Sequence, residues 1–387
     1  MRLKTILVFV LIMPFTVFTY AQKAKGSRLH WNIAAELPAP DGKSKPLGVA
    51  GPVTGIHKDV LIVGGGANFP DSMPWQGGKK KYYDEIYIYK QQRKSLVLQK
   101  EVVKLPSAIA YPASCSTPQG VVYAGGENKQ GLSNKVYLLR WDDTKKTIHS
   151  SELPELPNPL TNASAVYINN TIYLAGGETS AAASSLFLKL DLNNLDAGWQ
   201  ILPDIPKPVS HTVMVALEGK SGNISIYIVG GRKKNSDGIS ELYNSVFSFD
   251  TQKGAWEIKQ NLPYALSAGT GIAQGWKNIL IFGGDRGETF HKTEKLIAAI
   301  NAETDEIKKS ELIRQKNELQ SYHPGFSHDV LVYNIAADEW KKLDEIPYES
   351  PVTTTAVIWN KKVLIPSGEI KAGVRTPQIL VAKLRGR

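Results

Sequence analysis

The chain has 387 residues, a formal net charge of +10 at neutral pH and a single cysteine, Cys115. A lone cysteine cannot form an intramolecular disulfide, which excludes the small secreted scaffolds that depend on several bridges. A chain of this length can bury a large core instead. Lys and Arg alternate with Asp and Glu, and the longest basic run is only residues 79–81. We therefore interpret the charge as solvated surface and expect no nucleic-acid partner.

The N-terminus has the pattern of a cleaved export signal. Two basic residues, Arg2 and Lys4, precede an apolar stretch at 5–18 and a small-residue exit that ends at Ala21. This pattern predicts a signal peptide at 1–21 and a single mature domain at 22–387. The apolar stretch is shorter than the roughly 20 residues of a membrane-spanning helix. We therefore expect no membrane association after cleavage.

Six segments of the chain share one pattern, in which an apolar strand ends in two small residues and a polar loop leads to a second apolar strand. The small pairs lie at 64–65, 125–126, 176–177, 230–231, 283–284 and 367–368. Each unit ends in Leu-Pro or Ile-Pro, which we call the exit of the unit. In four units a tryptophan precedes the exit: Trp31, Trp199, Trp256 and Trp340. Repeats of about 50 residues with short strands are typical of a β-propeller. A two-sheet sandwich does not explain six turns in register.

These glycine pairs, aromatic strands and late tryptophans resemble the kelch-repeat family, which implies an all-β, six-bladed propeller. The last unit has only one strand after its turn, at 377–384, whereas residues 29–38 supply an unpaired outer strand with its Trp and Leu-Pro. We therefore predict that the N-terminal strand pairs with the C-terminal blade and closes the ring. Closure hides strand edges that would otherwise promote aggregation.

The long interval between the fifth and sixth turns contains an insertion at about 286–324. Its middle, residues 294–320, spaces apolar residues as amphipathic helices do. We predict a helical excursion on the same face as the loops that follow the glycine pairs. The insertion is a lid or wall of a site, a homodimer contact or a decoration, and the sequence leaves these alternatives open.

Motifs for nucleotide binding, serine hydrolysis and metal binding are absent from the sequence, so we expect no cofactor and no metal. What remains is a set of polar residues on the loops after the glycine pairs, which converge around the channel of a propeller. The set is Asn68, Glu127, Glu178, Arg232, Asp285, Arg286, Glu369 and Arg375. For Glu127, Glu178 and Asp285 we favour a structural role, because their position repeats from blade to blade.

The last turn differs from the others. It reads Pro366-Ser367-Gly368-Glu369, and Gly373-Val374-Arg375-Thr376 follows closely. This stretch resembles the Gly-Glu and Gly-aliphatic-Arg-Thr pattern of the bacterial sialic acid mutarotases, the N-acetylneuraminate epimerase family of periplasmic kelch propellers. Residues 64–69 and 82–86 also resemble a segment of that family. The Gly-Glu blade comes last here, which implies a cyclically permuted form, and a closed ring tolerates such an order.

The resemblance implies an isomerase that interconverts the α and β anomers of N-acetylneuraminate in the periplasm. Glu369 would be the proton acceptor, by general acid–base catalysis, and Arg375 would bind the substrate carboxylate or form a salt bridge to Glu369. Arg232 and Arg286 are weaker candidates for the carboxylate, and Asn68 is a further binding candidate. Tyr83 or His211 would relay the second proton. The alternative function is a non-catalytic kelch module that binds carbohydrate or protein.

Overall fold

The computed structural model describes residues 29–39, 44–93, 95–99 and 103–384. Within these residues the strands form six blades of antiparallel sheet around a central channel, which confirms the predicted six-bladed propeller. The predicted signal peptide at 1–21 lies outside the described residues. Among the described helices, none is long and apolar enough to cross a membrane.

The blades follow one another along the chain, and each places its first strand at the channel. Blade one contains β2 (Val53–His57), β3 (Val60–Gly64), β6 (Glu85–Gln92), β7 (Ser95–Leu98) and β8 (Val103–Lys104). Blade two contains β9 (Ala113–Thr117), β10 (Gly120–Ala124), β13 (Val136–Asp142) and β14 (Thr147–Leu153). Blade three contains β15 (Ser164–Ile168), β16 (Thr171–Ala175), β17 (Phe187–Asp191) and β18 (Gln200–Ile201). Blade four contains β19 (Val213–Glu218), β20 (Ile224–Val229), β23 (Val246–Asp250) and β24 (Ala255–Lys259). Blade five contains β25 (Thr270–Gln274), β26 (Asn278–Phe282), β27 (Asp329–Asn334) and β28 (Glu339–Glu345). Blade six contains β29 (Val357–Trp359), β30 (Lys362–Pro366), β33 (Gln378–Lys383) and β1 (His30–Glu36). Two short 3-10 helices, η1 (Pro74–Gln76) and η2 (Leu195–Ala197), lie in loops of blades one and three.

The ring closes as the sequence predicted. Strand β1 pairs antiparallel with β33, from His30 opposite Lys383 to Glu36 opposite Gln378. The backbone N–H of Leu29 also donates to Asp344 of blade five at 2.7 Å. Blade six is therefore built from both ends of the described chain.

A collar of backbone hydrogen bonds surrounds the channel. One residue per blade, just before the first strand, donates its N–H to the carbonyl of the equivalent residue in the preceding blade, at 2.7–3.1 Å. All six have positive φ angles, and they are Gly51, Tyr111, Asn162, His211, Ala268 and Thr353. A cavity of about 80 Å³ continues along the channel from these residues. The collar therefore fixes the relative positions of the six blades at the channel.

The late tryptophans link neighbouring blades. The indole N–H groups of Trp199, Trp256 and Trp340 donate to backbone carbonyls of the preceding blade at 2.8–2.9 Å, and each acceptor lies two residues before the Leu-Pro or Ile-Pro exit. Trp31, on the strand β1 that closes the ring, makes no such hydrogen bond in the part of the chain that the structure describes. The buried indole nitrogen of Trp31 has no hydrogen-bond partner among the described residues, and its ring packs edge-on against Phe282, with centroids 5.8 Å apart.

The register of the first turn differs from our prediction. In blades two to five the residues with paired positive φ angles are the predicted glycines, whereas in blade one they are Gly65 and Gly66 (φ 65° and 87°), and Gly64 is the last residue of β3. Three consecutive glycines made the pair ambiguous in the sequence. As a consequence, Ala67 and not Asn68 occupies the position that follows the pair.

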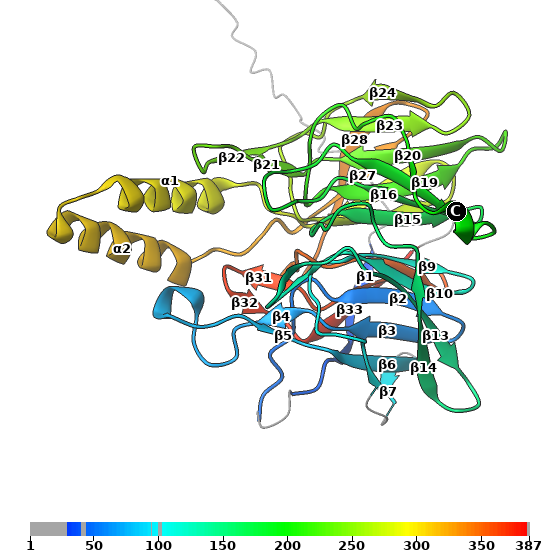
Figure 1. Ribbon diagram of the computed structural model, residues 1–387, viewed down its shortest axis with the longest axis horizontal. Helices are drawn as coiled ribbons and strands as arrows, with labels where there is room; N and C mark the ends of the chain where they lie inside the picture. The colour runs from blue at the N-terminus through cyan, green and yellow to red at the C-terminus, as the bar shows by residue number, and fades with distance from the viewer. Residues whose placement is uncertain (1–28, 40–43, 94, 100–102, 385–387) are drawn as a thin grey trace, which may run out of the picture.

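The insertion is helical and consists of α1 (Glu288–Ala302) and α2 (Glu306–Ser321). It projects from the same face as the small hairpins that follow the glycine pairs, as predicted (Figure 1). Those hairpins are β4 (Ala67–Asn68) with β5 (Lys81–Tyr82), β11 (Glu127–Asn128) with β12 (Gly131–Leu132), β21 (Arg232–Lys234) with β22 (Ser240–Leu242), and β31 (Glu369–Lys371) with β32 (Val374–Arg375).

Within the two helices of the insertion, Glu294 is the residue that is buried. Ile307 is 83% exposed, and the buried residue of α1 is a carboxylate, Glu294. Glu294 accepts hydrogen bonds from the backbone N–H and the hydroxyl of Ser240, at 2.8 and 2.7 Å. The helix α1 is therefore attached to blade four by hydrogen bonds of a buried carboxylate.

Candidate functional site

One residue in each blade follows the pair of small residues and forms a backbone bridge with the residue that precedes the collar residue of the same blade. We call these six residues the slot residues, and the end of the propeller where they lie the mouth. They are Ala67, Glu127, Glu178, Arg232, Asp285 and Glu369. Because the same bridge holds each of them, they lie at equivalent depth around the channel.

Glu369 and Arg375 face each other across the β31–β32 hairpin, where their backbones are paired. The Oε1 atom of Glu369 accepts the backbone N–H of Gly373 at 2.8 Å and lies 3.4 Å from Nη1 of Arg375. The Glu369 side chain is 20% exposed and that of Arg375 only 4%. The structure thus brings the two predicted residues together, with the carboxylate reachable from the mouth.

The guanidinium of Arg375 is not satisfied by the protein. Its Nε and Nη1 atoms are buried and have no hydrogen-bond acceptor among the described residues. Its plane lies over the ring of Phe69 from blade one, with the guanidinium carbon 4.9 Å from the centroid. A buried cation without full hydrogen bonding is costly. The site is therefore suited to an anionic ligand that offers acceptors to a planar guanidinium.

The hairpin that carries this pair is held from both sides. Gly373 has a φ of 72°, and a Cβ there would lie 2.8 Å from Pro74 and 3.1 Å from Trp75, so only glycine allows the loop with η1 to approach. On the other side, the fully buried hydroxyl of Ser367 accepts the N–H of Val49 at 2.8 Å and lies 2.8 Å from the carbonyl oxygen of Thr376. The serine that replaces a glycine in this turn therefore fastens the residue next to Arg375.

Asn68 and Tyr83 form a hydrogen-bonded pair within blade one. Both are buried, with 2% and 5% of their surface exposed, and the phenol of Tyr83 donates to Oδ1 of Asn68 at 2.8 Å. The amide of Asn68 donates to the carbonyl of Gly48 at 2.7 Å. Their polar groups thus join the start of blade one to its first hairpin.

His211 and Arg232 form a second polar cluster across the mouth. Nη2 of Arg232 lies 3.2 Å from Nε2 of His211, whose Nδ1 lies 3.0 Å from the hydroxyl of Ser210. That hydroxyl donates to the slot residue Glu178 at 2.7 Å. Burial and the charge of Arg232 hold the pKa of His211 well below its ordinary value. His211 is therefore a neutral member of a hydrogen-bonded chain.

Arg286 points to a different partner. It forms an ion pair with Asp329 and stacks over the ring of Tyr264, 3.8 Å from its centroid. The structure does not bring Arg286 together with Glu369 and Arg375. The slot residue Glu127 also bonds to a neighbouring blade, because it accepts from Lys80 at 3.0 Å and from Tyr82 at 2.8 Å.

Tyr111 is a site residue that sequence reasoning missed. It belongs to the collar, and its phenol lies beside Arg375, with Lys80 5.1 Å from its ring centroid. Burial raises the pKa of the Tyr111 phenol, against the opposing charges of Lys80 and Arg375, so it is a hydrogen-bond donor at neutral pH. The sequence did contain a signal for this position. In blades two to five, the collar residue lies six positions after the Leu or Ile of the Leu-Pro or Ile-Pro that ends the preceding repeat unit.

No group of three or more His, Cys, Asp or Glu side chains that could hold a metal ion occurs among the described residues. The mouth instead offers carboxylates, two guanidiniums, a phenol and buried imidazoles. Such a set can transfer protons and bind an anionic, hydroxylated small molecule.

The model of one protein family, described as N-acetylneuraminate epimerase, matches residues 16–148 and 153–387. The chain belongs to the N-acetylneuraminate epimerase family. The family match includes both the Glu369–Arg375 hairpin and the blade-one segment that packs Phe69 against it. The cyclic permutation of blade order stays a prediction.

Individual relatives of the epimerase family align over part of their length. An N-acetylneuraminate epimerase of Salmonella typhimurium is 28% identical over 60% of this chain and 58% of the relative. Epimerases of Vibrio vulnificus and Brucella melitensis are 25% and 26% identical, over 58% and 66% of this chain and 58% and 64% of the relatives. In each case the aligned region spans less than two thirds of the relative.

Proposed function

We propose that this protein is a mutarotase that interconverts the α and β anomers of N-acetylneuraminate. The observation that carries the proposal is the buried guanidinium of Arg375: its Nε and Nη1 atoms make no hydrogen bond among the described residues, and Nη1 lies 3.4 Å from Oε1 of Glu369. A sialic acid has a carboxylate on the same carbon as its anomeric hydroxyl. A carboxylate bound by Arg375 would therefore bring that hydroxyl to the neighbouring carboxylate, Glu369.

In the proposed reaction Glu369 accepts the proton of the anomeric hydroxyl while the ring oxygen gains a proton and the ring opens. The open-chain ketone then turns and closes on its other face. Proton transfer by a positioned group contributes about 10²–10⁴-fold to a rate. The family membership supports this reading, since the relatives are named for epimerisation of N-acetylneuraminate.

The test is the rate of anomer interconversion, followed by NMR after addition of freshly generated α-N-acetylneuraminate. We expect wild-type protein to accelerate it, and Glu369→Gln to bind the sugar but lose about 10²–10⁴-fold in rate. Wild-type protein that binds the sugar without changing the rate would be a carbohydrate-binding module instead. Full activity of Glu369→Gln would remove Glu369 from the mechanism.

We also propose that the protein is exported to the periplasm, on the basis of the signal-like pattern of residues 1–21. Expression of the full chain in a Gram-negative host should yield a periplasmic protein whose first residue is Gln22. Retention of Met1 in a cytoplasmic fraction would contradict this.

A further inference from the structure

Asp285, the slot residue of blade five, is held in the same way as Glu369 in the adjacent blade six. Its Oδ1 atom accepts the backbone N–H of Gly287, two residues further along its own loop, at 2.8 Å. Glu369 likewise uses one oxygen to bind a backbone N–H of its own loop. Glu127 and Glu178 instead bond to side chains of neighbouring structure. Among the described residues, Oδ2 of Asp285 has no hydrogen-bond donor, so one oxygen remains available to a ligand.

A cavity of about 250 Å³ lies next to Asp285. His323, Pro324 and Gly325, where the chain returns from the insertion, also line it. This return segment lies against β31, because a Cβ built on Gly325 would be 3.5 Å from the carbonyl oxygen of Ile370, the residue after Glu369. The backbone N–H of Ser327 donates to the carbonyl of Gly284 at 2.9 Å and fixes the segment beside Asp285. The cavity is thus open to Asp285 and borders the Glu369 hairpin.

The surroundings of Asp285 favour the protonated acid. Burial raises its pKa, and the negative charge of Glu369 adds to this, whereas the N–H of Gly287, Arg232 and His323 oppose it. Two carboxylates in unlike environments are a common arrangement for one acid and one base. Glu369 has the guanidinium of Arg375 at 3.4 Å; Asp285 has no ion pair among the described residues.

His323 is the nearest competitor for the role of acid. Its Nδ1 accepts the backbone N–H of Gly325 at 3.0 Å, so in the neutral ring the proton resides on Nε2. Burial lowers the pKa of His323, and Lys371 acts in the same direction, against Asp285 and Glu369. A neutral imidazole can donate a hydrogen bond but would have to become an imidazolate to donate a proton. His323 is therefore suited to orient a ligand rather than to protonate it.

We propose that Asp285 is a second catalytic residue, the acid that protonates the ring oxygen while Glu369 deprotonates the anomeric hydroxyl. The inference rests on the proposed mutarotase function and deepens it. In the opening step the anomeric O–H proton passes to Glu369, the bond from the anomeric carbon to the ring oxygen breaks, and the ring oxygen takes the proton of Asp285. On closure the ring hydroxyl returns its proton to Asp285 as it attacks the other face of the ketone, and Glu369 returns its proton to the carbonyl oxygen.

The experiment measures anomer interconversion for wild type, Asp285→Asn, Asp285→Glu and Glu178→Gln across pH 4–9. We expect Asp285→Asn to lose about 10²–10⁴-fold in rate. The wild-type rate should fall as pH rises through the pKa of Asp285, and this alkaline limb should disappear in Asp285→Asn. Asp285→Glu should restore part of the rate. Glu178→Gln is the matched control, a carboxylate in the same slot two blades away, and should lose far less.

A slow Asp285→Asn variant with an unchanged pH profile would show a structural role and overturn the inference. An Asp285→Asn variant of wild-type activity would overturn it as well. Both outcomes leave the proposed function intact as long as wild type is active and Glu369→Gln is not. If wild type itself does not accelerate the reaction, the proposed function fails, and the role of Asp285 fails with it.

Discussion

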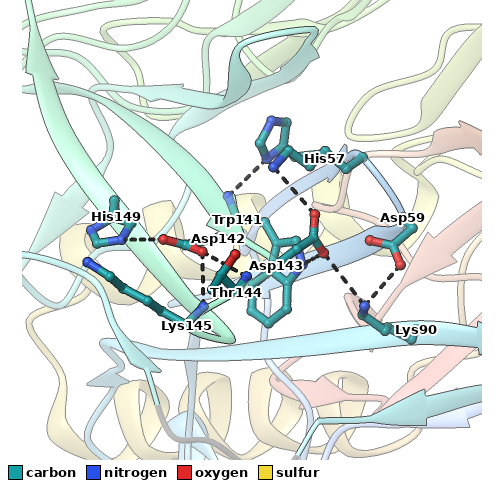
Figure 2. A network of polar contacts seen from close by, with 10 residues as sticks. His57, Asp59, Lys90, Trp141, Asp142, Asp143, Thr144, Lys145 and His149 are labelled. Carbon is teal, nitrogen blue, oxygen red and sulfur yellow. Dashed lines mark hydrogen bonds and ion pairs between the residues drawn. The ribbon is translucent and has the colours of Figure 1, made fainter.

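Two polar clusters lie at opposite ends of the strands, one at the mouth and one where β2 turns into β3. In the second cluster, between blades one and two, Nδ1 of His57 accepts the backbone N–H of Trp141 at 2.9 Å, and Asp143 accepts the indole N–H of Trp141 at 2.6 Å (Figure 2). Lys90 bridges Asp59 and Asp143, at 2.9 and 3.7 Å. Each of these groups finds its partner within the protein.

The cluster at the mouth is different, because Arg375 is almost completely buried and keeps two nitrogen atoms without acceptors. A polar group that is satisfied within the fold contributes to stability, whereas one that is left unsatisfied lowers stability unless a ligand completes it. The contrast indicates that the two clusters have different roles. Substitutions in the first should change stability, and substitutions in the second should change ligand binding.

The largest effect is expected at the mouth. Arg375→Met should weaken binding of N-acetylneuraminate by about 10–150-fold, the equivalent of about 1.5–3 kcal/mol for hydrogen bonds to a charged group. Thermal stability should change little, because removal of the incompletely hydrogen-bonded cation offsets the loss of its ion pair with Glu369. Calorimetric titration and thermal unfolding measure the two quantities. A large loss of stability with unchanged affinity would reverse the contrast.

The far cluster should show the opposite behaviour. His57→Phe keeps an aromatic ring but removes the acceptor for the buried N–H of Trp141, which should lower the free energy of unfolding by about 1–3 kcal/mol. Denaturant titration measures this. His57→Asn, whose amide oxygen can replace Nδ1, is the matched control and should lose less. Mutarotation by both variants should match wild type at a temperature where they are folded.

The tryptophans offer the same contrast within one residue type. Trp256→Phe removes an indole N–H that donates to Pro203 at 2.9 Å and should cost about 1 kcal/mol of stability beyond the change in packing. Trp31→Phe removes an indole N–H without a partner among the described residues, so the hydrogen-bond part of its cost should be absent. Equal hydrogen-bond costs for the two variants would contradict this reading.

The smallest effect concerns pH. The pKa of His57 is lowered, mainly by burial, from an ordinary value of 6.5. The unfolded chain therefore binds this proton more readily, so the contribution of His57 to stability is present above about pH 6.5 and is lost as pH falls through the folded pKa. His211 and His323 shift in the same direction. The melting temperature should decrease below about pH 6.5, less steeply in His57→Asn. A slope identical to wild type would exclude His57 as a source.

The fold followed from the sequence because each blade repeats the same local chemistry. The glycine pairs, the exits and the second strands each mark one blade, and Trp31 with its Leu-Pro identified the strand that closes the ring. The predicted position of the first glycine pair was wrong by one residue, because three adjacent glycines fit the pattern equally well. The spacing of apolar residues correctly predicted helices in the insertion, but it could not show that Glu294 would be the buried residue, because spacing does not show which side chains another element covers.

The site was only partly predictable for a related reason. Glu369 and Arg375 lie on one hairpin, so their spacing already placed them together. Tyr111 and Phe69 meet Arg375 only because separate blades converge, and no local pattern encodes that approach. Asp285 was interpreted as a repeated structural residue, and only its hydrogen bonding distinguishes it from Glu127 and Glu178.

The closure of the ring by β1 and β33 has a consequence for synthesis. The hairpin with Glu369 and Arg375 emerges from the ribosome after the first five blades, and its blade needs a strand that was made before them. No partial chain can therefore contain a finished site. The proposed mutarotation therefore depends on both β1 and β33, and a chain that lacks either strand is expected to be inert rather than partly active.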